Sequence, residues 1–495
     1  MKSEIIVNKN YTIGEIDKRL YGSFVEHLGR CVYGGIYEPG HETADENGFR
    51  KDVLELVKKI DAPIIRYPGG NFVSGYRWED GIGDRSKRPK RLDSAWRNTE
   101  TNEVGIDEFQ QWAKQANAEI LMTVNLGTRG AEDAKNLLEY CNMTTDTYYA
   151  NLRRENGFEE PFNIKTWCLG NEMDGWSWQI GHKTADEYGR IAAETAKLMK
   201  RTVHDIELIA SGSSGHEMPT YMDWEWTVLN HTYEHIDYIS LHQFYNNIEN
   251  DTAGFIGKSV QMDKFIKSVA AVCDAVKAKK NTDKVVNLSF DEWNIWNHKH
   301  MENDMWAVAP ARLEDIFTFE DALLIGCMLM TLQNNCDRVK IACMAQLVNV
   351  LAPIMTQNGG GVWLQTIFYP FMYGSVYGRG TAMKPVVKCD TYKTDYADVP
   401  YIETSVIHNA ENKEIVVFAV NRSLDEDMDV NITFEDFGKC APFEHIELYS
   451  EDFQACNSAE CEKVAPAKLD VKCEKNVIQN VILKKHSWNM IRYKY

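Results

Sequence analysis

Eight short apolar runs, each followed by small or polar residues, constrain the fold of this 495-residue chain more than any other feature. The interior of each run is apolar at consecutive positions, which is typical of parallel strands that helices cover on both faces. The runs span residues 21–29, 62–71, 119–127, 164–172, 206–214, 236–245, 285–294 and 339–349. Helical patterns lie between many of them, at 49–61, 105–117, 183–203, 262–280 and 320–337. This alternation predicts an α/β fold, a (β/α)₈ barrel with long loops.

A doubly wound open sheet is the main alternative to the barrel. Such sheets usually carry a glycine-rich phosphate-binding sequence after an early strand. No G-x-G-x-x-G or G-x-x-x-x-G-K-[ST] sequence follows any early run, and the glycines at 359–361 lack the lysine of a phosphate loop. These glycines therefore predict a flexible loop, and the barrel is favoured over the open sheet.

The pattern changes near residue 380, where helical periodicity ends. Short alternating runs separated by turn residues follow, at 414–422, 429–437, 444–450, 475–485 and 487–495. That spacing is typical of an antiparallel β-sandwich. Residues 3–16 also resemble a strand or hairpin, and we expect them to join the carboxy-terminal sheet. The predicted organisation is an N-terminal strand at 1–16, a barrel at 17–380 and a β-sandwich at 381–495.

The formal net charge of −19 disfavours a nucleic-acid partner, because no basic stripe is available to displace counterions from a phosphate backbone. No apolar run reaches the roughly 18 residues of a membrane span, and the first residues, MKSEIIVNKN, contain no apolar core of a signal peptide. The twelve cysteines are scattered without a C-x-x-C pair, so we expect reduced thiols and no zinc or disulfide framework. These features predict a cytoplasmic protein that does not bind membranes.

The active site of a (β/α)₈ barrel lies at the carboxyl ends of its strands, where the polar residues that follow the runs should converge. These residues are Glu26, His27, Arg66, Asn71, Asn171, Glu172, His242, Phe244, Tyr245, Asp291, Glu292, Gln346 and Asn349, with Trp176, Trp178, Trp293 and Trp296 nearby. Amides and carboxylates bind hydroxyl groups, and aromatic ring faces cover C–H patches. The set therefore predicts a sugar-binding site.

Two glutamates, Glu172 after the fourth run and Glu292 after the seventh, should face each other across the barrel mouth. Glycosidic cleavage needs such a pair: one carboxyl protonates the leaving oxygen, and the other attacks the anomeric carbon or activates a water. Asn171, beside Glu172, could hold the sugar 2-hydroxyl, a contact that strengthens as positive charge develops at the anomeric carbon.

Each of these residues also has an ordinary structural interpretation. A glutamate after a strand can be a solvated loop acid or a helix cap, and the tryptophans can be core residues. Asp291 could serve as the partner of a barrel arginine, and Arg66 could serve only to pair with an acid. His298 and His300 are expected to be loop residues rather than metal ligands. The signals gain strength because they follow successive predicted strands.

The chain resembles the family 51 glycoside hydrolases, the α-L-arabinofuranosidases of a retaining (β/α)₈ clan. The resemblance covers nearly the whole chain, although GNE alone would mark only the broader clan. The matching motifs are GSFVEHLGRCVYGGIYEP (22–39), RYPGGNFVSGYRWEDGIG (66–83), WCLGNEMDG (167–175), DYISLH (237–242), LSFDEWNIW (288–296) and AQLVNVLAPIMT (345–356).

This resemblance implies a retaining exo-α-L-arabinofuranosidase that releases terminal arabinofuranose from oligosaccharides of arabinan or arabinoxylan. We expect no cofactor, and no metal because the strand ends offer too few convincing His, Asp and Glu ligands. The resemblance makes Glu172 the general acid/base and Glu292 the nucleophile. It further implies an intracellular homo-oligomer, commonly a hexamer in this lineage. The expected substrate-site residues are Glu26, Arg66, Asn71, Asn171, Tyr245, Gln346, Trp178 and Trp296, with Arg66 supporting the side of the nucleophile.

One motif departs from the family pattern. The usual His-x-Tyr-Tyr reads His242-Gln243-Phe244-Tyr245, so the first aromatic lacks the hydroxyl that bonds the nucleophile. Either Tyr245 supplies that hydroxyl after a local shift, or the hydrogen bond is absent.

Two alternatives to the arabinofuranosidase activity remain. One alternative is another specificity, such as endo-glucanase or β-xylosidase activity, which pocket shape would decide. The other is a non-catalytic sugar-binding protein or a metal-dependent barrel isomerase.

Overall fold

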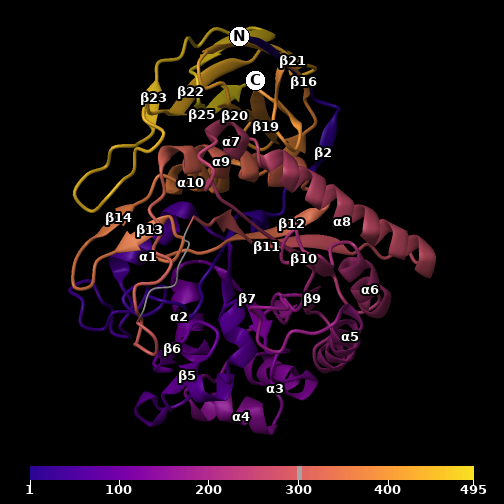
Figure 1. The fold of residues 1–495 in the computed structure, drawn as a ribbon, viewed down its shortest axis with the longest axis vertical. Helices are drawn as coiled ribbons and strands as arrows, with labels where there is room; N and C mark the ends of the chain where they lie inside the picture. The colour runs from indigo at the N-terminus through magenta and orange to yellow at the C-terminus, as the bar shows by residue number, and fades with distance from the viewer. Residues whose placement is uncertain (298–303) are drawn as a thin grey trace.

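The computed structural model describes residues 1–297 and 304–495, and its larger part is a closed parallel barrel (Figure 1). All eight predicted runs contain barrel strands, in the order β10-β11-β12-β3-β4-β7-β8-β9. The strands are β3 (Gly22–Phe24), β4 (Ile64–Tyr67), β7 (Glu119–Val124), β8 (Thr166–Leu169), β9 (Glu207–Ala210), β10 (Tyr238–Tyr245), β11 (Asn287–Ile295) and β12 (Val339–Met344). Every residue of β4 and β8 is buried, as the consecutive apolar positions require. The predicted barrel is confirmed.

Ten α-helices occur in the described residues. They are α1 (Lys51–Ile60), α2 (Ile106–Gln115), α3 (Ala131–Asn142), α4 (Tyr148–Glu155), α5 (Ala185–Thr202), α6 (Asp223–Thr232), α7 (Thr252–Ile256), α8 (Ser259–Lys280), α9 (Phe319–Asn334) and α10 (Phe368–Tyr377). Helix α9 packs against strands of the barrel and of the second domain, and its residues 319–333 are all buried. A helix covered on every side must be apolar on every side, which explains its lack of a polar face.

The second domain is a sandwich of two sheets, with strand orders β16-β1-β21-β24 and β2-β15-β19-β20-β25-β22-β23. Its strands are β1 (Lys2–Asn8), β2 (Thr12–Glu15), β15 (Thr381–Met383), β16 (Val386–Lys388), β19 (Ile402–Asn409), β20 (Glu414–Asn421), β21 (Met428–Glu435), β22 (Ala441–Leu448), β23 (Ala467–Leu469), β24 (Ile478–Leu483) and β25 (Ser487–Lys494). Buried and less buried residues alternate along β21, because one face of its sheet packs on the core and the other faces water.

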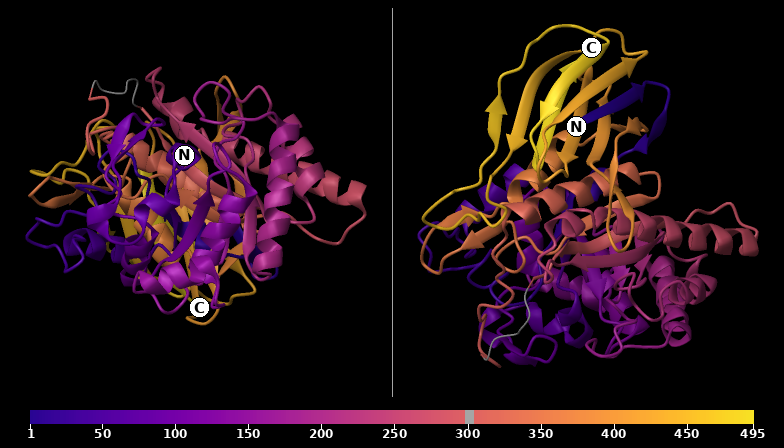
Figure 2. Two further views of the ribbon diagram at one scale, coloured as in Figure 1. Left: turned by 90° about the horizontal axis from the view of Figure 1, so that it is seen from below. Right: turned by 45° about the horizontal axis from the view of Figure 1, so that its top comes forward.

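The N-terminal strand belongs to this sandwich, as predicted. Strand β1 pairs in parallel with β21, with Ile5 opposite Ile432, and antiparallel with β16, while β2 pairs with β15. The right view of Figure 2 shows these indigo strands among the orange and yellow strands of the second domain. The chain therefore starts and ends in the same domain. The limits 1–16, 17–380 and 381–495 stay a prediction.

Three hairpins extend from this frame, and one of them helps to build the site. They are β5 (Arg91–Asp93) with β6 (Asn98–Glu100), β13 (Ile354–Thr356) with β14 (Val362–Leu364), and β17 (Thr391–Lys393) with β18 (Asp398–Pro400). The glycines at 359–361 lie in the turn between β13 and β14, where a loop was predicted. His298 and His300 lie outside the described residues. None of the helices in the described part of the chain combines the length and apolarity that a membrane crossing requires.

Candidate active site

A cavity of about 420 Å³ lies at the carboxyl ends of the barrel strands. Seven of the ten predicted site residues line it: Glu26, Asn71, Glu172, Trp178, Glu292, Trp296 and Gln346. Two more, Arg66 and Asn171, touch lining residues from behind, through the hydrogen bonds described below. The tenth, Tyr245, does not line the cavity. The barrel topology therefore brings together side chains that are up to 320 residues apart in the sequence.

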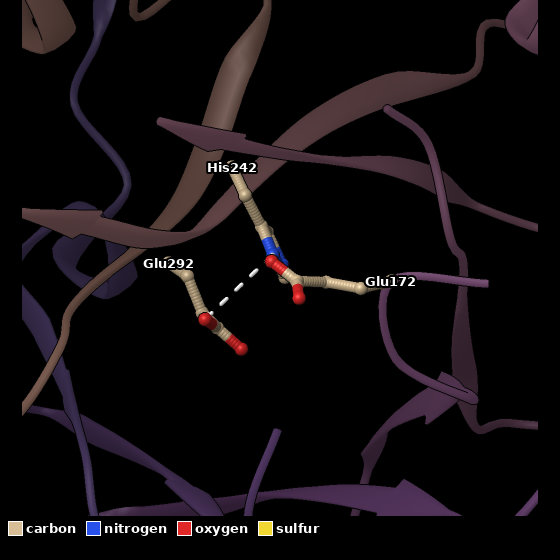
Figure 3. A group of neighbouring side chains, drawn as sticks. All are labelled: Glu172, His242 and Glu292. Carbon is tan, nitrogen blue, oxygen red and sulfur yellow. Dashed lines mark hydrogen bonds and ion pairs between the residues drawn. The ribbon is translucent and has the colours of Figure 1, made fainter. Parts of the chain in front are cut away.

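The two predicted catalytic carboxyls face each other in this cavity. Glu292 lies in β11, whereas Glu172 lies three residues beyond the end of β8 and has a φ of 43°. One oxygen of each carboxyl and Nδ1 of His242 all lie within 4.8 Å of one another (Figure 3). This spacing fits the separation of roughly 5–5.5 Å that double displacement requires better than the 6.5–9.5 Å of inverting glycosidases.

Glu292 is buried beside a permanent cation. The Arg66 guanidinium forms an ion pair with Glu292 Oε1, and its second terminal nitrogen donates a 2.7 Å hydrogen bond to Asn171 Oδ1. Burial raises the pKa of Glu292 to about 7, against the opposing effects of His242 and Arg66. The charged form of Glu292 is therefore present at neutral pH because two cations offset part of the cost of burial.

Glu172 has different partners. Its Oε2 accepts a 3.0 Å hydrogen bond from the indole Nε1 of Trp178, and its Oε1 lies 3.0 Å from Nδ1 of His242. Trp178 is 44% exposed and follows Glu172 in the same loop. The acid/base candidate is itself buried, and the indole that bonds it reaches the surface.

A second layer of charge lies beneath the two glutamates. His242 contacts Asp291 through Nε2, at 3.4 Å, and Asp291 also lies 3.5 Å from Nε of Arg66. Burial alone would lower the pKa of His242, but Glu292, Asp291 and Glu172 raise it to about 10. Burial alone would raise the pKa of Asp291, but Arg66 and His242 lower it to about 2. The predicted pairing of Asp291 with a barrel arginine is confirmed.

The same cluster could hold a metal by its spacing. Glu172, His242 and Glu292 each offer a ligand atom within 4.8 Å of the others. A metal needs the neutral imidazole, however, and the three neighbouring carboxylates keep His242 protonated at neutral pH. The donor set therefore fits an ion-pair network better than a metal centre.

The far end of the cavity is a hydrogen-bonded wall around Glu26. Its Oε1 accepts from the backbone N–H of Gly70 and Phe72, both at 3.0 Å, and from Nε1 of Trp96 at 2.9 Å. Its Oε2 accepts a 2.9 Å hydrogen bond from Gln346. Burial raises the pKa of Glu26 despite these donors. Sequence reasoning missed Trp96, which lies in the turn between β5 and β6, outside every periodic pattern.

Asn71 and Asn171 connect this wall to the nucleophile candidate. The side-chain nitrogen of Asn171 donates to Oδ1 of Asn71 at 3.2 Å. Gly70 lies beside them, and a Cβ at that position would be 2.7 Å from Oε1 of Glu292. The RYPGGN sequence needs glycine here because the backbone passes too close to the carboxylate for any side chain.

The expectation that Tyr245 binds substrate is corrected by the structure. Successive residues of a strand point to opposite faces, so His242 and Phe244 share the face toward the cavity and Tyr245 points away. Tyr245 is buried in the main core, and its hydroxyl has no hydrogen-bond partner among the described residues. Phe244 lines the cavity and packs edge-to-face on Trp296, with ring centroids 5.5 Å apart. No phenol from β10 therefore reaches Glu292.

Comparison with known proteins identifies the family. The α-L-arabinofuranosidase 1 domain matches residues 56–256, and the α-L-arabinofuranosidase C-terminal domain matches residues 291–487. The chain is similar to intracellular exo-α-(1→5)-L-arabinofuranosidase 1 of Bacillus subtilis, with 54% identity over 100% of this chain and 99% of the relative. The chain belongs to the α-L-arabinofuranosidase family. The enzyme of Acetivibrio thermocellus named intracellular exo-α-(1→5)-L-arabinofuranosidase is also 54% identical, over 99% of both chains.

Solved structures of α-L-arabinofuranosidases have the same fold as this family member. A family 51 α-L-arabinofuranosidase from Bifidobacterium longum superimposes with a TM-score of 0.95 at 43% identity, over 99% of both chains. The arabinose complex of the Thermotoga maritima enzyme superimposes with a TM-score of 0.88 at 33% identity, over 99% of both chains. The resemblance to glycoside hydrolase family 51 is confirmed.

Proposed function

We propose that the chain is a retaining, exo-acting α-L-arabinofuranosidase that releases terminal arabinofuranose from arabinan- and arabinoxylan-derived oligosaccharides. The observation that carries this proposal is the pair Glu172 and Glu292, whose oxygens lie within 4.8 Å of each other in a cavity of about 420 Å³. Family membership supports arabinofuranose as the sugar that is released. The short distance between the two carboxyls supports double displacement rather than inversion.

In the first step, Glu292 attacks the anomeric carbon while Glu172 gives its proton to the glycosidic oxygen. The C–O bond to the leaving group breaks, and a covalent arabinosyl ester of Glu292 forms. In the second step, Glu172 acts as a base and takes a proton from water, which attacks the same carbon and releases arabinose. Arg66 holds the attacking carboxylate in place through its ion pair with Glu292.

The remaining predicted residues are proposed to bind the sugar. Their amide and carboxylate groups suit the hydroxyls of a furanose, and their ring faces suit its C–H surface. We propose that Asn171 holds the 2-hydroxyl and that Glu26, Asn71 and Gln346 hold the deeper hydroxyls. Trp178 and Trp296 are proposed to contact the sugar that leaves.

Exo action is favoured over endo-glucanase activity because one end of the cavity is walled. Glu26 bonds to both Trp96 and Gln346, so the chain of a polysaccharide cannot pass through that end. The names of relatives point to (1→5)-linked arabino-oligosaccharides, although a Bifidobacterium longum relative at 47% identity is named exo-α-(1→6)-L-arabinofuranosidase. We propose the (1→5) linkage as the preferred one.

We also propose that the enzyme works inside the cell, as the names of its relatives state for those proteins, and that it assembles as a homo-oligomer. The expected assembly is the hexamer that is common in the lineage. Size-exclusion chromatography with light scattering would give its mass, and a monomeric mass would contradict the oligomer.

A panel of substrates tests the activity. Aryl α-L-arabinofuranoside and (1→5)-linked arabino-oligosaccharides should be hydrolysed, while aryl β-xyloside and soluble cellulose should not. Proton NMR during the first turnovers should detect arabinose with the configuration of the substrate. Inverted product would contradict double displacement, and release of internal fragments from debranched arabinan would contradict exo action. No hydrolysis of any arabinofuranoside would favour a sugar-binding protein.

A further inference from the structure

His242 occupies a central position that the proposed reaction does not yet use. It is buried at the cavity end of β10, and Nδ1 lies 3.0 Å from Oε1 of Glu172 and 3.7 Å from Oε2 of Glu292. Figure 3 shows the two glutamates approaching this side chain from opposite sides. One ring nitrogen can therefore donate to either carboxyl after a small shift of the ring.

The other ring nitrogen faces a buried acid below the site. Nε2 lies 3.4 Å from Oδ1 of Asp291, and Asp291 is fully buried. Arg66 and a 3.1 Å hydrogen bond from the thiol of Cys168 hold Asp291 in its charged form. The charged groups that face the imidazole are thus Asp291 and Glu292 from β11 and Glu172 from the loop after β8. Three acids around one buried ring favour the imidazolium.

Double displacement moves one negative charge across the cavity. Before the first step, Glu292 is charged and Glu172 carries a proton. After that step, Glu292 is a neutral ester, and Glu172 is charged because its proton has left with the leaving group. Arg66 contacts Glu292 and Asn171, and its contacts in the described residues do not include Glu172. His242 is the cation in the described chain that contacts both carboxyls.

We infer that His242 is a positioning residue whose imidazolium keeps both protons throughout the cycle and shares its Nδ1–H between the two carboxyls, 3.0 Å from Glu172 and 3.7 Å from Glu292 in the structure, moving toward whichever carries the negative charge. No bond to His242 forms or breaks. The inference rests on the proposed double displacement. Phe244 lines the cavity from the same strand but has no hydrogen-bonding group, so the imidazolium is the donor on the cavity face of β10.

The test is the pH profile of kcat/KM for a His242→Asn variant. Asparagine keeps an N–H near the position of Nδ1 but removes the charge. Without the shared cation both carboxyls are harder to ionise, so both limbs of the profile should move together to higher pH, by about one unit or more. His216→Asn is the matched control, because His216 bonds Gln243 outside the cavity, and its limbs should not move.

Two outcomes overturn the inference. If kcat/KM of His242→Asn is lower at every pH but the limbs of its pH profile do not move, His242 has a purely structural role. If only one limb moves, His242 affects the ionisation of only one carboxyl. If His242→Asn does not fold, ¹⁵N NMR of wild-type enzyme labelled with ¹⁵N-histidine tests the inference instead. At least one imidazole should keep both nitrogens protonated from about pH 5.5 to about pH 8.5. If every histidine is neutral at the upper limit, the inference is wrong.

Failure of the proposed function would look different. Wild-type hydrolysis of an aryl α-L-arabinofuranoside is measured first, and its absence would contradict the function without involving His242. With that activity in hand, the limb positions of the variants test the inference alone.

Discussion

Glu172 and Glu292 are the same side chain on opposite sides of one cavity, yet the protein holds them in different ways. Glu292 lies inside strand β11, where the pairing with both neighbouring strands shifts register, and it pairs with the buried guanidinium of Arg66. Glu172 lies in a loop, accepts a hydrogen bond from the neutral indole of Trp178 and lies 3.0 Å from the imidazole of His242. A permanent guanidinium suits a carboxylate that attacks, whereas Glu172, which has no guanidinium partner among the described residues, can take and give a proton at lower cost. The partners of each glutamate, rather than its identity, therefore assign its role.

Removal of the nucleophile should have the largest effect. Glu292→Ala is expected to lower kcat/KM by about 10⁵-fold on every arabinofuranoside, because no other carboxyl can form the covalent ester. Steady-state rates with aryl substrates of different leaving-group pKa measure this effect. The loss should be the same for good and poor leaving groups. A loss confined to poor leaving groups would mean that the two roles are reversed.

Removal of the acid/base should have a smaller effect that depends on the substrate. Glu172→Ala is expected to lower kcat by about 10²–10⁴-fold, because a good aryl leaving group departs without a proton while the ester waits for a base. Azide needs no base, so it should restore turnover and give an arabinosyl azide of retained configuration. If azide restores nothing, Glu172 is not the acid/base.

A substitution beside Glu292 that leaves Glu172 unchanged tests how firmly the nucleophile candidate is held. Gly70→Ala places a Cβ about 2.7 Å from Oε1 of Glu292. The carboxylate must move, so we expect a loss of about 100-fold in kcat, with a melting temperature within a few degrees of wild type. Gly75→Ala is the matched control, because nothing lies within 4 Å of its added methyl group. Equal activity of the two variants would contradict a fixed position of the nucleophile.

The smallest expected effect is on pH dependence. Glu292 attacks only when ionised, and burial raises its pKa to about 7, so kcat/KM should fall about tenfold per unit below that pH. Arg66 lowers this pKa, so Arg66→Gln should move the acid limb to higher pH. Arg66→Lys keeps the charge and should move the limb less. An acid limb near 4.5 in the wild type would contradict the effect of burial.

Much of the fold could be predicted from the sequence because the patterns that indicate it involve neighbouring residues. Apolar runs at consecutive positions mark strands that helices cover on both faces, and all eight runs contain barrel strands. Polar residues at strand ends converge in any such barrel, which brought nine of the ten predicted residues to the cavity or directly behind it. Tyr245 was misplaced because the argument from strand ends ignored the alternation of faces along a strand.

The sequence alone determined the barrel, the sandwich and the two facing glutamates, because periodicity and strand ends are properties of neighbouring residues. Only the tertiary structure decided which partners surround each glutamate. Trp96 reaches Glu26 from a hairpin turn, and His242 touches acids from two other strand ends. Gly70 is needed because a strand 222 residues further on places Glu292 against its backbone. Contacts between distant segments form only when the barrel closes, so local sequence patterns do not predict them.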